Sequence, residues 1–337
     1  MPIEHRNNSF DFLRLIAALS VTFSHTFGFY KLPDDVEILT GFPASKFGLV
    51  TFFALSGFLV TKSFTQSATL FIYARKRFLR IYPALCVVVL LTMVVFGVFL
   101  TNLPAAAYFS HPLFLPYLKT LSLLRTQYAL TDIAVPNASL WTICLETRLY
   151  IWLVLMHFLG AFRRQWLFLG STALFFMAET VLQQPFCCHF LPATLLDTIH
   201  GYTEYGVIFM VGAVLQLYPS LLSYQTRWLL FLGVCLTVCS FFAPLLQAPV
   251  FSFVLPYLAI QLGLQASHFT TKIAAYGDFS YGIYVYSFPI QCLIIRYFGL
   301  NMPPFLLFLL MLVFILPFAI LSWHFIEKPA LRLKVAD

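Results

Sequence analysis

Apolar and polar residues are arranged along this chain in long blocks. The predominantly apolar blocks cover residues 12–30, 47–64, 84–102, 139–160, 165–183, 205–218, 227–245, 249–263, 279–298 and 303–325. Because a membrane-spanning helix needs roughly 20 apolar residues, this pattern predicts an all-α, polytopic membrane protein with about ten transmembrane helices. The longest segment between blocks, residues 103–138, is rich in proline and aromatic residues, and a re-entrant or interfacial piece is expected near Pro112 to Tyr128.

The composition agrees with this pattern. Hydrophobic residues make up 61% of the chain, charged residues only 10%, and the mean hydropathy is +0.87, whereas soluble domains carry roughly 25% charged residues. No room is left for a separate soluble domain of ordinary size, so residues 1–337 are predicted to form a single integral-membrane domain. The first block contains Arg14 and His25 and is followed by no small-residue cleavage site, which favours a retained helix over a signal peptide.

Lys and Arg are distributed unevenly between the segments that join the blocks. With the N-terminus placed in the cytoplasm, the cytoplasmic segments hold Arg6, Lys62, Arg75, Lys76, Arg77, Arg80, Arg163, Arg164, Arg227, Lys272, Lys328, Arg332 and Lys334, and the outer segments hold Lys31, Lys46, Lys119, Arg125 and Arg296. This bias predicts that both termini are cytoplasmic. The net charge of +7 then reflects membrane topology rather than nucleic-acid binding.

One short cluster has metal-binding residue types. Cys187, Cys188 and His189 are adjacent, but no second ligand pair stands near them. Structural zinc needs four spaced ligands, so no metal site is predicted.

Ionisable residues inside apolar blocks are costly to insert into a bilayer and are therefore functional candidates. Those within or next to a block are Asp11, Arg14, His25, Glu146 and Arg148, with Glu179 near the outer end of its block. Arg14 and His25 are eleven residues apart. At 3.6 residues per turn this is just over three turns, so both are expected on one helix face, about 16 Å apart along the axis.

Arg14 would place a cation near the cytoplasmic end of the helix, and His25 would place a titratable base deeper in the bilayer. This arrangement suits a tunnel that an anionic donor enters from the cytoplasmic side. Two other interpretations stay open. Arg14 can extend to the inner interface with its charged end in water, and His25 can be a hydrogen-bonded packing residue between helices.

The fourth block reads SLWTICLETRLYIWL and runs inwards from the outer side, which places Glu146 about 10 Å below Ser139. That is the depth expected for His25. A carboxylate beside an imidazole orients it and raises its basicity, as in acyl-transfer sites. In the alternative interpretation, Arg148 neutralises Glu146 in a buried structural pair.

The segment ARKRFLRIYP joins the second and third blocks on the predicted cytoplasmic side. Its Arg and Lys side chains suit phosphate binding through the guanidinium fork. Charge alone favours the alternative, a positive anchor that touches lipid head groups.

Six short motifs stand out in order along the chain. They are FDFLRLIAALSVTFSH with Arg14 and His25, FFALSGFLV with Ser56 and Gly57, RFLRIYP with Arg77 and Arg80, LWTICLETRLY with Trp141, Glu146 and Tyr150, and finally DFSYGIYVYSFPI and FIEKP. Together they resemble the motifs of the acyltransferase family 3 integral membrane proteins, which O-acylate surface polysaccharides and related acceptors. The resemblance covers nearly the whole chain.

The resemblance implies an O-acetyltransferase of the bacterial inner membrane, with acetyl-CoA or another acyl-CoA as co-substrate and no permanently bound cofactor. His25 is then catalytic, and Glu146 orients or stabilises its imidazole. Arg77 and Arg80 would hold the CoA phosphates, and Arg14 would line the donor path. The motif residues expected to line the tunnel or to serve the structure are Ser56, Gly57, Trp141 and Tyr150.

The implied acceptor is a hydroxyl group of an envelope polysaccharide or a lipid-linked glycan, and residues 103–138 are expected to recognise it. One departure concerns the ninth block, where Ser287 stands at a position that is often His in the family. That segment is therefore assigned only a structural role. Some relatives carry an additional esterase-like domain, and this chain stops at Asp337, so a second transfer step outside would need a periplasmic partner enzyme.

Two chemical schemes fit these residues. His25 removes a proton from the acceptor hydroxyl as it attacks the thioester, or His25 takes the acyl group and passes it outward. The alternative function is a proton-coupled transporter or flippase of a glycan or acyl carrier, because intramembrane His, Glu and Arg also serve transport. That alternative predicts substrate movement without thioester cleavage, and a non-catalytic scaffold would not require Arg14 and His25.

Overall fold

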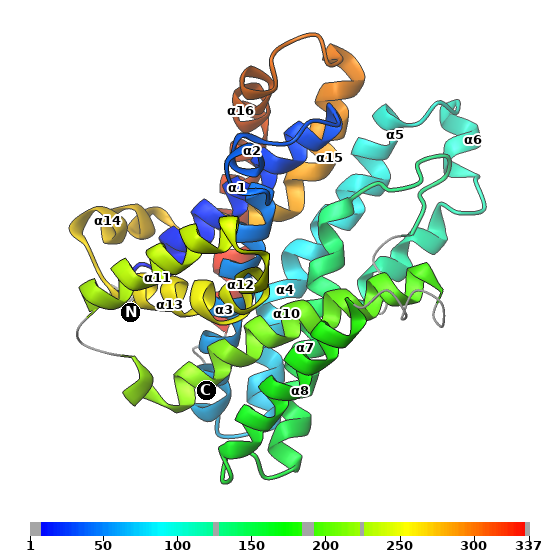
Figure 1. The fold of residues 1–337 in the computed structure, drawn as a ribbon. Helices are drawn as coiled ribbons and strands as arrows, with labels where there is room; N and C mark the ends of the chain where they lie inside the picture. Colours follow the sequence, from blue (N-terminus) through cyan, green and yellow to red (C-terminus); the bar gives the residue numbers. More distant parts are fainter. Residues whose placement is uncertain (1–7, 124–127, 184–191, 223–225, 334–337) are drawn as a thin grey trace. The chain divides into compact units, whose positions relative to one another are not determined.

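A computed structural model describes residues 8–123, 128–183, 192–222 and 226–333. Helices dominate these ranges (Figure 1), in which β geometry is limited to an isolated bridge between Leu130 and Ile133. The predicted all-α class is therefore confirmed. Several residues used above, among them Arg6, Arg125, Lys334 and the adjacent Cys187, Cys188 and His189, lie outside the described ranges.

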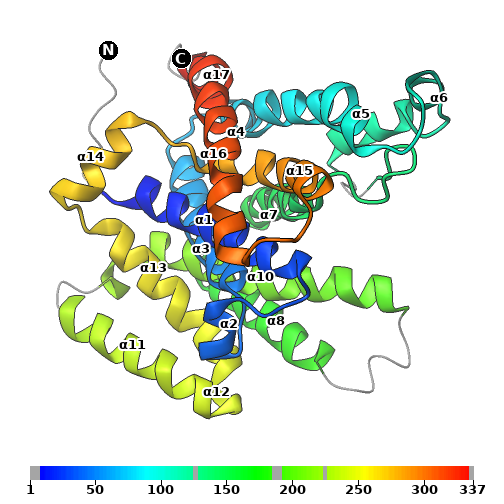
Figure 2. The ribbon, with the colours of Figure 1, turned by 90° about the horizontal axis from the view of Figure 1, so that it is seen from above.

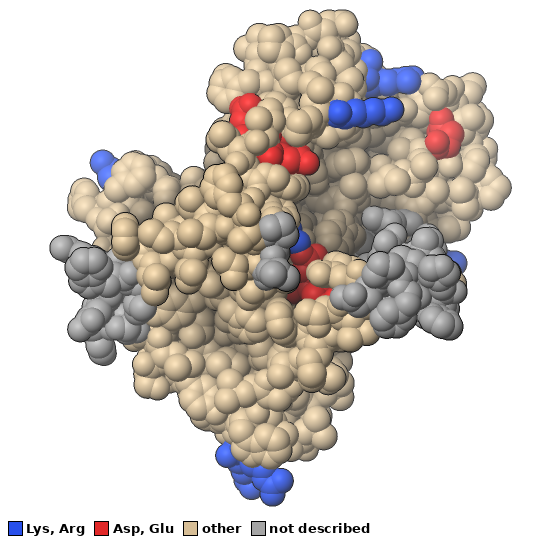
Figure 3. Space-filling view, in the orientation of Figure 1, with Lys and Arg blue, Asp and Glu red and all other residues tan. Residues whose placement is uncertain are grey.

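Within the described ranges, six helical segments are long and apolar enough to cross a membrane. They are Phe10–Phe29, Ala44–Thr65, Leu70–Leu100, Ala138–Phe158, Leu246–Leu264 and Pro304–Arg332. On the face drawn in Figure 3, most described residues are neither Lys, Arg, Asp nor Glu, as expected of a surface that meets lipid. The chain is thus a multi-pass membrane protein, while the number of ten spans and the cytoplasmic termini stay predictions.

By its internal contacts the chain divides into two compact units. The first comprises Met1–Arg14, Phe47–Gln66 and Leu145–Ala275, and the second comprises Leu15–Lys46, Ser67–Cys144 and Tyr276–Asp337. Two helices, α1 (Phe10–Phe29) and α7 (Trp141–Phe158), contribute residues to both units. That residues 1–337 act as one functional domain stays a prediction.

The first unit is built from long helices and shorter connecting ones. Besides parts of α1 and α7, they are α3 (Ala44–Thr65), α8 (Trp166–Leu182), α10 (Ala193–Leu217), η4 (Pro219–Leu221), α11 (Thr226–Phe242), α12 (Pro244–Pro249), η5 (Val250–Val254), α13 (Leu255–Leu264) and α14 (His268–Tyr276). Helices α11 and α13 lie side by side in both views (Figures 1 and 2). The predicted block 249–263 corresponds to the end of α12, η5 and most of α13.

Helices α3 and α10 approach each other closely at two glycines. A Cβ atom added to Gly57 would lie 1.9 Å from the carbonyl oxygen of Phe209, and one added to Gly212 would lie 2.3 Å from that of Ala54. Both distances are far below van der Waals contact. Small residues are what allow helix backbones to pack closely in a membrane, so these glycines determine the α3–α10 contact.

The second unit contains the remaining helices. Besides most of α1, they are α2 (Asp35–Thr40), α4 (Leu70–Leu91), η1 (Thr92–Phe96), α5 (Gly97–Leu100), α6 (Ala105–Phe109), η2 (Leu115–Ser122), η3 (Ala138–Leu140), α15 (Ser280–Phe298), α16 (Pro304–Ser322), η6 (Trp323–Glu327) and α17 (Lys328–Arg332). Helices α15 and α16 run alongside each other (Figures 1 and 2), with Gly282 against Ala319.

The long helix that begins with α4 contains a widened, π-helical turn, η1. Such a turn shifts the regular backbone pairing by one residue. The carbonyl group of Met93 in this turn accepts a hydrogen bond from the Tyr108 hydroxyl on α6, at 2.8 Å. A Cβ atom on Gly97 would lie 2.0 Å from that hydroxyl oxygen, so the glycine provides the space for the tyrosine.

The segment 103–138 contains α6, η2 and η3, and residues 124–127 lie outside the described ranges. The expected interfacial piece near Pro112 to Tyr128 thus includes the short 3₁₀ helix η2. Within this segment, the carboxylate of Asp132 accepts hydrogen bonds from the hydroxyl groups of Thr101 and Thr131 and from the backbone N–H of Asn102. Burial alone would raise the pKa of Asp132, but these hydrogen bonds outweigh it and lower the pKa to about 2. The Asp132 carboxylate therefore stays ionised near neutral pH.

Candidate active site

His25 lies on α1 in the second unit. Its imidazole is partly exposed, but the Nδ1 atom is buried and has no hydrogen-bond partner among the described residues. The ring of Phe288 on α15 meets the imidazole edge to face, with ring centroids 5.9 Å apart and planes at 89°. A buried polar atom without a partner requires an explanation, and a role in chemistry is one of the few available.

Helix α15 is held beside this position by an asparagine. Pro289 has no backbone N–H, so the carbonyl group of Val285, four residues earlier, loses its helical partner. The side-chain amide of Asn137 donates to that carbonyl at 2.8 Å, and Asn137 is only 2% exposed. Ser287 is fully buried and donates to the Tyr284 carbonyl at 3.1 Å.

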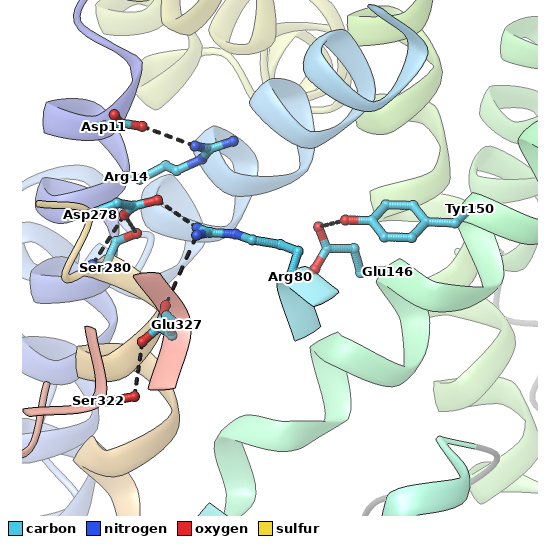
Figure 4. A network of polar contacts seen from close by, with 9 residues as sticks. All are labelled: Asp11, Arg14, Arg80, Glu146, Tyr150, Asp278, Ser280, Ser322 and Glu327. Carbon is cyan, nitrogen blue, oxygen red and sulfur yellow. Dashed lines mark hydrogen bonds and ion pairs between the residues drawn. The ribbon is translucent and has the colours of Figure 1, made fainter. Parts of the chain in front are cut away.

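Glu146 lies on α7 in the first unit, where two hydroxyl groups reach it. The Ser56 hydroxyl on α3 donates to the Oε1 atom of Glu146 at 2.5 Å. The Tyr150 hydroxyl, one turn further along α7, donates to the same oxygen, as Figure 4 shows. Three residues from two different motifs thus form one hydrogen-bonded group. Trp141, which was expected to line the tunnel or to serve the structure, is the first residue of α7 and is partly exposed.

Arg148 does not pair with Glu146. Its guanidinium instead lies over the ring of Tyr202 on α10, 4.8 Å from the ring centroid. The alternative interpretation of a buried Glu146–Arg148 pair is therefore wrong. Whether Glu146 serves His25 stays a prediction.

Arg14 pairs with Asp11, one turn earlier on α1, through Nη1 and Oδ1 at 3.2 Å (Figure 4). Both side chains are 18% exposed. The two in-span charges at the start of the first block therefore neutralise each other locally, which lowers the cost of placing them in an apolar segment. A partly exposed guanidinium can still contact a donor, as the role of Arg14 on the donor path requires.

Arg80 on α4 is shared by two buried carboxylates of the second unit. Its Nη2 atom lies 2.6 Å from Oδ2 of Asp278, and its Nη1 atom lies 4.0 Å from Oε2 of Glu327 (Figure 4). Ser280 donates to Asp278, and Ser322 donates to Glu327 at 2.9 Å. This network ties α4 to the start of α15 and to η6, a π-helical turn of a kind frequent at functional sites.

Arg77 precedes Arg80 by one turn of α4 and is partly exposed. Residues three apart lie on neighbouring positions of a helix surface. The network around Arg80 therefore also fixes the position of the turn that carries Arg77.

The roles of Asp278 and Glu327 were not predicted from the sequence. Both belong to the late motifs DFSYGIYVYSFPI and FIEKP, to which no catalytic or binding role was assigned. The available signal was their position: each is a carboxylate at the edge of a strongly apolar block, and such a group needs a cation. Among the described residues, no group of three or more His, Cys, Asp or Glu side chains has an arrangement that could hold a metal ion.

Replacing Arg80 with alanine is expected to lower the free energy of unfolding by about 3 kcal/mol, because it leaves two buried carboxylates without their cation. The measurement is the thermal unfolding temperature of the detergent-purified protein. Arg163→Ala, an exposed arginine in the loop between α7 and α8, is the control and should leave it unchanged. If Arg80 only bound the donor, Arg80→Ala would raise the KM for acyl-CoA and keep the wild-type unfolding temperature.

The fold and these residues define a multi-pass membrane protein with titratable groups among its apolar helices. Residues 7–324 match the family model described as the acyltransferase domain. An O-acetyl transferase of Shigella phage Sf6 is 29% identical over 341 residues, which cover 96% of this chain and 96% of that protein. Nodulation protein 10 of Rhizobium leguminosarum bv. viciae is 29% identical over 365 residues, covering 98% and 95%, respectively.

No solved structure matches the chain. Because the family model covers nearly the whole sequence, the chain belongs to the acyltransferase 3 family. It is an acyltransferase, and this confirms the resemblance seen in its motifs.

Proposed function

We propose that this protein transfers an acyl group, in the first instance acetyl, from cytoplasmic acyl-CoA to a hydroxyl group of a cell-envelope glycan or lipid-linked saccharide. The observation that carries the proposal is His25: within the family's domain, its imidazole has a buried Nδ1 atom that no described residue satisfies. The relative named O-acetyl transferase supports acetyl as the group and oxygen as the receiving atom. The Lys and Arg distribution supports an orientation with both termini cytoplasmic. We place the protein in the bacterial inner membrane, as the resemblance to the family implies.

In the direct scheme, the acceptor oxygen forms a bond to the thioester carbonyl carbon while His25 takes the hydroxyl proton. The carbon–sulfur bond then breaks, and the CoA thiolate receives that proton. In the two-step scheme, an imidazole nitrogen first bonds to the carbonyl carbon and CoA leaves as the thiolate. The acceptor oxygen then displaces the imidazole, and the acceptor's hydroxyl proton passes to the thiolate. Both schemes restore His25 and release one CoA for each acyl group transferred.

Positive charge on His25 develops in either scheme, so a nearby carboxylate would favour the reaction. We assign this part to Glu146, whose orientation is held by the hydroxyl groups of Ser56 and Tyr150.

We place the CoA phosphates at the basic segment that contains Arg77 and Arg80, with Arg14 along the path. Guanidinium groups suit phosphate because they bind it in a bidentate manner. At Arg80, a phosphate has to compete with Asp278 and Glu327, so Arg77 is expected to contribute more to donor affinity. No permanently bound cofactor is required, since the thioester is already activated.

The experiment uses the purified protein in detergent with acetyl-CoA, with and without an envelope-glycan extract as acceptor. Release of free CoA and the appearance of acetyl groups on the glycan are measured together. Without the acceptor, we expect CoA to be released slowly. With the acceptor, we expect faster release, with one CoA released for each acetyl group that appears on the glycan. Folded protein that neither binds nor cleaves acetyl-CoA, but moves labelled glycan across vesicle membranes, would establish the transporter alternative instead.

A further inference from the structure

Helix α15 contacts the turn of α1 that carries His25 at three points. The side-chain amide of Gln291 donates to the Thr22 carbonyl at 2.9 Å and to the Thr26 hydroxyl at 3.0 Å. One turn earlier on α15, the ring of Phe288 packs against the imidazole of His25 itself. Gln291 is fully buried, at 0% exposure, so these hydrogen bonds do not compete with water.

The orientation of the Gln291 amide is determined by chemistry. The Thr22 carbonyl can only accept a hydrogen bond, and the Thr26 hydroxyl proton already has acceptors in the Thr22 carbonyl at 3.0 Å and the Met311 sulfur at 3.5 Å. Both groups therefore need a donor, which is the amide nitrogen of Gln291. If the amide were flipped, its oxygen would face the Thr22 carbonyl oxygen, and neither atom could donate a hydrogen bond. The Oε1 atom of Gln291 consequently stays buried without a partner among the described residues.

A buried glutamine that leaves one acceptor unsatisfied is a costly way to join two helices, because an apolar side chain could pack there without that cost. Its specific effect is to hold α1 at Thr22 and Thr26, which lie on either side of His25 along one turn. Together with Phe288, it restricts both the position of that turn and the rotation of the imidazole.

We propose that Gln291 is a positioning residue for acyl transfer: it locks the Thr22–Thr26 turn of α1 and thereby holds the His25 imidazole at the place where the proton or the acyl group is transferred. This inference rests on the proposed function, in which His25 is catalytic. It gives α15 a part in the reaction although the segment lacks the second histidine of the family's pattern.

The test replaces Gln291 with methionine, which has a similar volume and no amide. We expect kcat to fall about 10- to 100-fold, since displacements of 1 Å at a reacting group cost factors of this order, while the KM for acetyl-CoA changes less than twofold. The pH dependence of kcat should also shift, because the surroundings of the imidazole change. In a His25→Ala background the same substitution should have no further effect, since residues that act as a unit are not additive.

The matched control is Gln261→Met. Gln261 is a buried glutamine (4% exposed) on α13, whose amide donates to the Tyr257 hydroxyl at 2.9 Å, and this variant should keep the wild-type kcat and pH profile. Thr26→Val keeps Gln291 but removes its hydroxyl partner with little change of shape. It should lower kcat in the same direction, even if Gln291→Met gives too little folded protein.

The outcomes separate this inference from the function on which it rests. If His25→Ala retains transfer, the catalytic assignment itself fails. If His25→Ala is inactive but folded Gln291→Met, or Thr26→Val in its place, keeps wild-type kcat and pH dependence, only the positioning role of Gln291 is overturned.

Discussion

Replacement of His25 with alanine is expected to lower the rate of acyl transfer by about 100- to 10,000-fold, the range that a positioned general base or acid contributes. The structure supports a specific effect on chemistry, because the His25 ring is partly exposed, its Nδ1 atom bonds to no described residue, and its described ring contact is with Phe288. Few stabilising interactions are thus lost. Donor affinity should be retained, because the proposed phosphate ligands lie elsewhere on the chain. Release of CoA and acetylation of the acceptor measure the rate.

The control for this substitution is His157→Ala. His157 is an exposed histidine on α7 whose ring contacts Phe64 and Phe158, and its removal should leave the rate within about twofold of the wild type, as is usual for a surface position without a specific role. A His25→Ala protein that transfers acetyl at the wild-type rate would contradict the catalytic assignment. If His25→Ala gives no folded protein, the rate of transfer is measured instead for His25→Gln, which preserves polarity and size, and is again compared with that of His157→Ala.

Replacement of Gly57 with alanine is expected to destabilise the protein by about 3 kcal/mol, the upper part of the usual range for overpacking. The new methyl group would stand 1.9 Å from the Phe209 carbonyl oxygen and 3.0 Å from its Cα atom. These are backbone atoms, so relief requires a shift of α3 against α10 rather than a side-chain rotation. Such a shift would also alter the Ser56–Glu146 contact beside it. The unfolding temperature and the yield of monodisperse protein report the effect.

Gly170 provides the matched control for this prediction. It lies on α8, and a Cβ atom added there meets no atom within 4 Å. Gly170→Ala should therefore keep or raise stability, because alanine favours a helix over glycine by about 1 kcal/mol. Equal stability of Gly57→Ala and Gly170→Ala would show that α3 and α10 are further apart than described here.

The helices could be predicted from the sequence because the physical constraint is strong. A long apolar block in lipid has to satisfy its backbone hydrogen bonds internally, and the helix is the local way to do so. The interruptions are harder to predict. Within block 249–263, Pro249 and Pro256 flank the π-helical turn η5, and hydropathy alone contains no information on such a change of pitch.

Individual site residues could be predicted where a motif places an ionisable side chain in an apolar block. The side chains that contact them could not be predicted, because the tertiary structure brings them together. Glu146 was recognised as a carboxylate in an apolar block, but its contacts with the hydroxyl groups of Ser56 and Tyr150 were not predicted. Arg80 and Asp278 are 198 positions apart, and only the tertiary structure brings them together. Gln291 was missed because a single amide in an apolar block attracts less notice than a charge.

The widened turn η1 has a consequence for comparing relatives of this protein. A π-helical turn corresponds to one residue inserted into an α-helix. Here the inserted residue is accommodated because Tyr108 satisfies the Met93 carbonyl and Gly97 makes space for the tyrosine ring's hydroxyl. Alignments of the family should therefore show a one-residue gap near 92–96 in members that lack this tyrosine and glycine. If relatives gain or lose the π-helical turn, the tyrosine and the glycine together, the inserted residue was retained because the tyrosine hydroxyl supplies a hydrogen bond to the backbone carbonyl of the turn.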